Sequence, residues 1–325
     1  MKFALVGDVM LGRLVNEFLN SAPPGYPWGD TLPIFRQADW RFCNLECVIS
    51  DRGRPWSATP KVFHFRSDAK NLAVLEVAKI TAVSLANNHA LDFEYDAMFE
   101  MFGILDKARI ARAGAGRDIE EAIQPAVCEV AGKKIGTVAF TDNEPAWEAK
   151  KDQPGIFYVP VDLSNSRAKA LLEIIRQTKT KVDFLIVSAH WGPNWGYEPP
   201  AEQIPFARAL LDAGADLIFG HSGHVFRGIE IYQGKPIIYC AGDFIDDYAV
   251  DEVERNDESF IFVLETEGGK IQKLQLYPTI IAEFQARLAK STKAEVIAGK
   301  MQKLCEGFAT QAVWEQEEAC LEIRI

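Results

Sequence analysis

Short apolar runs alternate with longer amphipathic segments along most of the chain. Runs followed by glycine or polar residues predict buried strands over residues 2–7, within 38–50, and over 80–86, 182–188 and 215–219. The segments between them predict helices over residues 68–79, 94–108, 164–179 and 201–213. Asp68 stands at the N-cap position of the first helix. The pattern is therefore one of strands and helices in alternation.

Three other segments are typical of β-hairpins. They are residues 126–140 around Gly132, 228–244 around Gln233-Gly234, and 260–278 around Gly268-Gly269. Strand–helix alternation predicts parallel pairs of strands, and the hairpins add antiparallel pairs. We therefore expect an α/β fold, a four-layer α/β/β/α sandwich of two mixed sheets. We expect residues 1–282 to form one domain. Residues 283–325 should pack on it as a mainly helical C-terminal appendage with a strand-like run at its end.

Polar side chains stand at the carboxyl ends of five predicted strands. They are Asp8, Asn44 with Glu46, Asn88 with His89, His190, and His221 with His224. Open α/β sheets place ligands at this edge. Carboxylate, amide and imidazole groups without thiolate suit Mn²⁺, Fe²⁺ or Zn²⁺.

Each of these residues alone has a common structural explanation, such as a turn or a helix cap. Glu46 is different, because it lies in an apolar run and a buried carboxylate is costly unless it is paired or bound to metal. Together, the five strand ends predict a site for two divalent ions.

Composition and charge narrow the classes of partner. The chain has 325 residues, 48% of them hydrophobic and 25% charged, with a net charge of −11. This balance is globular, and the acidity argues against non-specific binding to nucleic acid or an anionic membrane. Six scattered cysteines without a CxxC pair indicate free thiols in a reducing compartment. We find no signal peptide and no membrane anchor, and we expect a cytoplasmic protein of undetermined oligomeric state.

Six motifs, in order, resemble those of the CapA family, which is named for poly-γ-glutamate capsule synthesis and resembles the calcineurin-like metallophosphoesterases. They are GDVMLGR, NLE, NNHALD, AHWG, GHSGHVFRGIE and GDF, within residues 1–264. The resemblance implies a metallophosphoesterase-like sandwich. It implies that Asp8 binds one metal and takes part in catalysis, and that Glu46 bridges two. It also implies that the remaining metal ligands come from Asn88, His190, His221 and His224. His89 would then be the acid that protonates the leaving group.

Two departures from the phosphatase pattern stand in these motifs. Met10 occupies the position of a histidine ligand. Two residues, rather than one, separate His221 from His224, so one alignment selects His221 and another selects His224.

These residues lead to two expectations about function. The first is a metal-dependent hydrolase, in which two ions activate a water for attack on a phosphoester or γ-glutamyl-type amide of an anionic small molecule or polymer. The second is a non-catalytic metal-binding accessory protein for poly-γ-glutamate synthesis or handling. The residues expected to hold the anionic substrate are Arg13, Asn44, Lys61, Arg66 and Arg227.

Overall fold

Ten strands form the larger of two sheets in the computed structural model, which describes residues 1–325. Its main path runs β19-β20-β17-β16-β1-β2-β5-β6, with β15 beside β1 and β18 beside β17. β1, β2, β5 and β6 are parallel, and β16, β17 and the strands beyond are antiparallel. The strands are β1 (Lys2–Val9), β2 (Trp40–Leu45), β5 (Ala82–Ser84), β6 (Ala111–Ala113), β15 (Asp243–Ile245), β16 (Glu258–Glu267), β17 (Lys270–Ala282), β18 (Gln285–Leu288), β19 (Ala312–Glu315) and β20 (Cys320–Ile323).

The second sheet has six strands in the order β13-β14-β12-β11-β9-β8. Its four central strands are parallel and its two edge strands are antiparallel to their neighbours. They are β8 (Ala126–Val130), β9 (Lys133–Thr141), β11 (Phe184–His190), β12 (Leu217–His221), β13 (Ile229–Tyr232) and β14 (Lys235–Ile238). Two small pairs lie outside both sheets, β3 (Val48–Ile49) with β4 (Arg66–Ser67), and β7 (Ala115–Gly116) with β10 (Gly155–Ile156).

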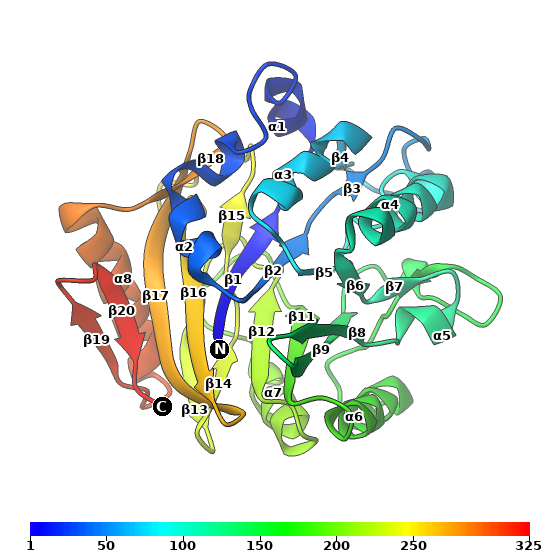
Figure 1. Cartoon of the computed structure of the whole chain (residues 1–325). Helices are drawn as coiled ribbons and strands as arrows, with labels where there is room; N and C mark the ends of the chain where they lie inside the picture. The colour runs from blue at the N-terminus through cyan, green and yellow to red at the C-terminus, as the bar shows by residue number, and fades with distance from the viewer.

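Helices cover the outer face of each sheet (Figure 1). The larger sheet is covered by α1 (Arg13–Phe18), α2 (Leu32–Gln37), α3 (Leu72–Val77) and α4 (Glu94–Ala108). The second sheet is covered by α6 (Ser166–Lys179) and α7 (Gln203–Asp212). The remaining helices are α5 (Ile119–Ala122), α8 (Ser291–Glu306) and the 3₁₀ turns η1 (Tyr26–Thr31), η2 (Ala69–Asn71) and η3 (Pro145–Trp147).

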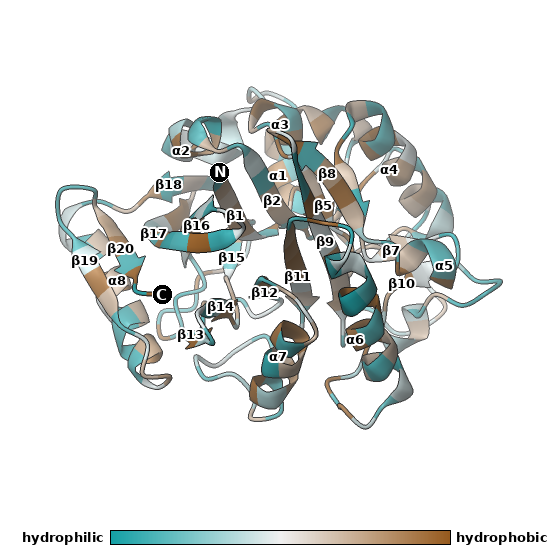
Figure 2. Cartoon of the chain, turned by 60° about the horizontal axis from the view of Figure 1, so that its bottom comes forward, coloured by the Kyte–Doolittle hydropathy of each residue, from teal (hydrophilic) through white to brown (hydrophobic).

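Three apolar layers fill the spaces between these four layers. Strand β1 shows how the sequence builds them, because its side chains alternate between two faces. Phe3 and Leu5 pack between the sheets, whereas Ala4 and Val6 pack under the outer helices. A third layer lies between the second sheet and helices α6 and α7. In Figure 2, the central strand β11 is brown, whereas α6 is banded teal and brown, as its half-buried position requires. The expected four-layer α/β/β/α architecture is confirmed.

Two local expectations need correction. The predicted helix over residues 68–79 is a 3₁₀ turn, η2, followed by the shorter helix α3. Asp68 does not cap it, because its carboxylate accepts a hydrogen bond from Asn16 Nδ2 instead (3.2 Å). Residues 283–325 provide the expected helix α8, but also three strands, β18, β19 and β20. β20 pairs with β17 and so protects part of that strand's edge.

The cysteines and helices bear on the remaining expectations. All six cysteines are free, and five of them are buried. None of the helices combines the length and the apolar character that a membrane span requires.

Candidate metal centre

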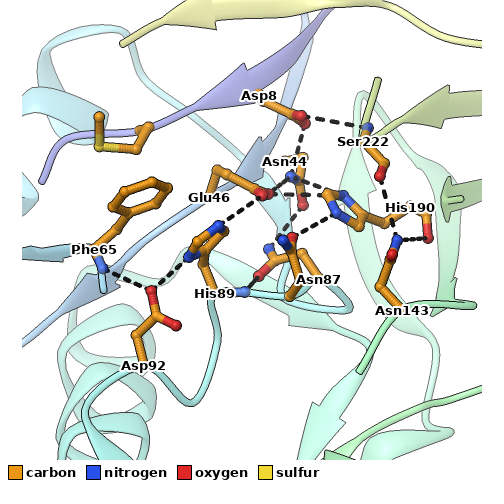
Figure 3. Close-up of polar contacts among 12 residues, drawn as sticks. Asp8, Asn44, Glu46, Phe65, Asn87, His89, Asp92, Asn143, His190 and Ser222 are labelled. Atoms are coloured by element: carbon orange, nitrogen blue, oxygen red, sulfur yellow. Dashed lines mark hydrogen bonds and ion pairs between the residues drawn. The ribbon is translucent and has the colours of Figure 1, made fainter. Parts of the chain in front are cut away.

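The carboxyl ends of the parallel strands in both sheets meet at one place, where polar side chains from distant segments point toward one another (Figure 3). Asp8 comes from β1, Asn44 from β2, and His190 and His221 from β11 and β12. Asp8, His190 and His221 each offer one ligand atom within 4.8 Å of the other two, and all three are buried. The topology therefore assembles a potential metal-binding triad.

Asp8 reaches this point because β1 comes very close to the segment before β15. A Cβ atom on Gly7 would lie only 1.9 Å from the carbonyl oxygen of Gly242, so only glycine fits there. The β1 ladder is irregular at Asp8, which pairs with Asp243 on one side and Asn44 on the other. Asp8 accepts hydrogen bonds from Asn44 Nδ2 (2.8 Å) and from the backbone N–H of Ser222 (3.3 Å).

Glu46 and Asn44 lie next to Asp8 and are joined to each other by a hydrogen bond. The Asn44 amide donates to both Asp8 and Glu46, and its own Oδ1 accepts from Asn87 Nδ2 (3.0 Å). Glu46 lies between two imidazoles, with Oε1 3.8 Å from His89 Nε2 and Oε2 3.7 Å from His190 Nδ1. Asn44 is fully buried beneath the carboxylates, so it orients them and is not exposed to a substrate, contrary to our expectation.

The two strand-end histidines are direct partners in the parallel β11–β12 ladder. Their Nδ1 atoms are 2.9 Å apart, and His221 Nε2 lies 2.6 Å from the hydroxyl of Ser188. His190 Nε2 lies 2.8 Å from Asn88 Oδ1. The expected residues Asn88, His190 and His221 are thus brought together.

His224 lies on a different side of the site. Its Nδ1 is 3.1 Å from Asp243 Oδ2, and its ring contacts Trp195 and Tyr248 with centroid distances of 5.4 and 5.1 Å. His224 lines a cavity, whereas His221 is completely buried with Asp8. The two residues between these histidines therefore separate them into two environments.

His89 has the surroundings of a positioned proton donor. Its Nδ1 donates to Asp92 Oδ2 (2.5 Å), and its ring stacks on Phe65 with centroids 3.9 Å apart. Asp92 also accepts from the Phe65 backbone N–H (2.6 Å). Because these contacts fix the ring, Nε2 is directed toward Glu46.

The protonation preferences of the buried groups fit a cation at this place. Burial, reinforced by the charge of Asp243, raises the pKa of Asp8 to about 8. Burial raises the pKa of Glu46 well above its ordinary value, and the negative charge of Asp8 adds to this effect. Burial lowers the pKa of His221 to about 3 and that of His190 well below its usual range.

Neither Asp8 nor Glu46 has a lysine or arginine partner; their ion-pair contacts are with histidines. Neutral imidazoles keep a lone pair for coordination, and buried carboxylates without a permanent counter-charge are stabilised by a divalent ion. The donor set therefore fits a divalent metal of the Mn²⁺, Fe²⁺ or Zn²⁺ type.

A cavity of about 480 Å³ opens beside this cluster. Arg13 and Lys61 are the two cationic side chains that line it, apart from histidines. Arg13 is partly exposed and pairs with Asp247 (3.2 Å). Lys61 is nearly buried, because Nζ donates to the carbonyl oxygen of Asn88 (2.6 Å) and lies near Asp92 and Glu144. Arg13 therefore has the more available charge.

Arg66 and Arg227 do not line the cavity, and we correct our expectation for both. Arg66 stacks over Phe93, 4.4 Å from the ring centroid, and donates to the carbonyl oxygen of Arg52 (3.2 Å). Arg227 is fully buried, and its guanidinium donates to the carbonyl oxygens of Pro193, Trp195 and Gly196. A guanidinium already held by three carbonyl groups supports a loop and is not available to a substrate.

Sequence reasoning missed two acidic residues of the site. Asp92 holds His89, and Asp243 holds His224. Both were visible, in the motifs NNHALD and GDF. Asp243 follows a glycine at the start of a short strand, as Asp8 follows Gly7 near the end of β1, so the repeated Gly-Asp pair was a usable signal.

Comparisons with known proteins agree with this picture. The family described as bacterial capsule synthesis protein PGA_cap matches residues 2–248. A probable polyglutamine synthesis accessory protein of Mycobacterium tuberculosis is 31% identical over 352 residues, covering 95% of this chain and 92% of that protein. The PGA biosynthesis protein CapA of Bacillus subtilis is 31% identical over 246 residues, 75% of this chain and 63% of that protein.

Among solved structures, a hypothetical protein from Thermus thermophilus shares the fold. It superposes with a TM-score of 0.52 at 17% identity, covering 86% of this chain and 98% of that one. The family assignment rests on the length of the sequence match and on the identity to the Mycobacterium tuberculosis protein, because the structural similarity shows the fold alone. This chain belongs to the PGA_cap family of bacterial capsule synthesis proteins.

Proposed function

We propose that this chain is a metal-dependent hydrolase that cleaves a phosphoester or a γ-glutamyl-type amide bond of an anionic substrate. One observation carries the proposal. A buried cluster of metal-type ligands lies beside a cavity, and a histidine fixed by an aspartate lines the same cavity. The family supports a polymer of the poly-γ-glutamate type as the first substrate to test.

Asp8, Glu46, Asn88, His190 and His221 are the residues that would hold the metal. When bound, a divalent ion of this class polarises a phosphoryl or carbonyl oxygen and lowers the pKa of water. Asn44 keeps the two carboxylates in place. His224, held by Asp243, is available on the cavity side as a further ligand or as a contact for the substrate.

His89 would supply the proton to the leaving group. Asp92 fixes the Nδ1 proton, so Nε2 is the atom available for transfer on the side of Glu46 and the cavity. Burial lowers the pKa of His89, although Asp92 opposes this effect, and a weakly basic imidazole gives up its proton readily once charged. Arg13 would hold an anionic group of the substrate at the wall of the cavity.

A second candidate is a metal-dependent binder that grips an anionic polymer without cleaving it. The observation that favours it is Met10, which stands where the phosphatase pattern has a histidine. Its sulfur accepts a hydrogen bond from the backbone N–H of Gly12 (3.0 Å), which makes it a poor ligand. The Mycobacterium tuberculosis relative is named an accessory protein.

One experiment separates the two candidates. Protein loaded with Mn²⁺ is assayed with bis-p-nitrophenyl phosphate, γ-glutamyl p-nitroanilide and poly-γ-glutamate, and metal content is measured on the same samples. A hydrolase turns over one of these substrates, and His89→Asn removes turnover while metal content stays unchanged. Bound metal with saturable polymer binding and no turnover would establish the binder, and no metal uptake would refute both.

A further inference from the structure

Residues 193–197 form one wall of the cavity through Asn194 and Trp195. This segment contains no helix or strand, yet its Trp195 ring contacts the His224 ring at 5.4 Å. His224 is also tied to the wall by its backbone, since its N–H donates to the carbonyl oxygen of Asn194 (2.7 Å). The position of the wall therefore sets the surroundings of a candidate site histidine.

The wall is held from the side by Glu254. The Gly196 N–H donates to Glu254 Oε2 (2.9 Å), and the Tyr197 hydroxyl donates to the carbonyl oxygen of Glu254. A second partner of that hydroxyl comes from far along the chain. Lys300 on helix α8 donates from Nζ to Tyr197 Oη (3.0 Å) and lies 4.9 Å from the centroid of the tyrosine ring.

Helix α8 offers an internal comparison, because two of its lysines share one carboxylate. Lys300 Nζ lies 2.9 Å from Glu258 Oε2, and Lys293 Nζ lies 2.5 Å from Glu258 Oε1. Glu258 is buried, so both pairs fasten the helix to the start of β16. Only Lys300 also reaches Tyr197; the side-chain contacts of Lys293 end at Glu258.

We propose that Lys300 is a positioning residue that, through Tyr197, fixes the Trp195 wall beside His224, so that the C-terminal helix controls access to the cavity. Lys300 lies outside residues 2–248, the part of the chain that matches the family. The effect of Lys300 on substrate binding rests on the proposed function, whereas its effect on the rigidity of residues 193–197 does not.

Hydrogen–deuterium exchange on the full-length protein tests the order of the wall. Lys300→Met keeps the aliphatic stem over the ring but removes the charged donor. It should accelerate exchange in the peptide spanning residues 193–197 by roughly tenfold. Tyr197→Phe should accelerate exchange in the same way. Lys300→Arg retains a donor for both Tyr197 and Glu258 and should keep exchange as slow as in the wild type.

Lys293→Met is the matched control, because it weakens the same attachment to Glu258 without touching Tyr197. It should lower the midpoint of thermal unfolding and leave exchange at residues 193–197 unchanged. The inference is overturned if Lys300→Met leaves exchange unchanged, or if Lys293→Met accelerates it equally. The second result would mean that helix docking alone orders the wall.

A kinetic measurement adds the consequence for substrate. If the Mn²⁺-loaded enzyme turns over one of the test substrates, Lys300→Met should raise KM roughly fivefold, change kcat less than about twofold, and leave Mn²⁺ affinity unaltered. A loss confined to kcat would overturn the role in access. If no substrate is turned over, the hydrolase proposal fails, and the exchange experiment still decides whether Lys300 orders the wall.

Discussion

The proposed inner ligands (Asp8, His190 and His221) and the cationic rim of the cavity (Arg13 and Lys61) are held in different ways. Asp8, His190 and His221 stand on strands of the two sheets, and each is almost completely buried. Arg13 stands at the start of a short helix and Lys61 in a loop, and the negative charge of an acidic partner offsets the positive charge of each. The inner ligands therefore have positions set by strand pairing, whereas the rim depends on local ion pairs that a single substitution can change.

The largest expected effect is on the inner side. Asp8→Asn should weaken Mn²⁺ binding more than about 100-fold, because the substitution removes one carboxylate ligand and its charge from the triad. Isothermal titration of the metal-free protein measures the change. Binding within a factor of about three of the wild type would exclude Asp8 as a ligand.

The same variant carries a signature in stability. Burial raises the pKa of Asp8 to about 8, so the ionised carboxylate destabilises the metal-free fold progressively as pH rises from about 4, its unfolded pKa, toward 8. Metal-free Asp8→Asn should therefore melt no lower than the wild type at pH 7.5, whereas added Mn²⁺ should stabilise the wild type alone. A lower melting temperature for the metal-free variant would contradict this reasoning.

The next effect concerns His89, the proposed proton donor. Asp92→Asn should lower kcat by about 100-fold and leave metal content unchanged, because the histidine loses the partner that fixes its tautomer. His89→Asn should have an effect at least as large. If Asp92→Asn retains full kcat, the hydrogen bond to His89 has no part in the reaction.

Arg227 tests the claim that a buried cation serves the loop and not the substrate. Arg227→Lys should reduce the free energy of unfolding by about 2 kcal/mol, since one ammonium group cannot reach the three carbonyl groups that the guanidinium holds. Urea unfolding measures this loss. If Arg227→Lys changes KM and leaves the free energy of unfolding unaltered, Arg227 contacts the substrate after all.

The smallest effect separates Arg13, which lines the cavity, from Arg66, which does not. Arg13→Met should raise KM about fivefold, because Arg13 lines the cavity and is partly exposed. Arg66→Met is the matched control and should leave KM within about twofold of the wild type, since Arg66 lies against Phe93 outside the cavity. Equal effects of the two substitutions would remove the distinction drawn between them.

The same contrast explains what the sequence could and could not predict. Asp8, His190 and His221 were predictable because an apolar run that ends in a polar residue fixes both the strand and the position of its last side chain. The four-layer fold followed from the same alternation of strands and helices. These features depend on the periodicity of the backbone, which a single sequence contains.

The surroundings of the cationic side chains were not predictable in the same way. Arg66 and Arg227 carry the charge that an anionic substrate would need. The orientation of Arg66 depends on Phe93, however, and that of Arg227 on carbonyl groups of residues 193–196. The strands of the C-terminal segment were also underestimated, since β18 and β19 are short and owe their conformation to pairing with β17 and β20. The contacts of the two arginines are tertiary, and no local pattern encodes them.

The antiparallel pairing of β1 with β16 has a consequence for the boundaries of this protein. β16 begins at Glu258, beyond the last residue that matches the family, yet it pairs with the strand that carries Asp8. A chain trimmed to residues 2–248 would leave residues 2–5 of β1 without their antiparallel partner and the inter-sheet core without Phe260, Phe262 and Leu264. The segment that the family description matches is therefore smaller than the segment that the fold requires.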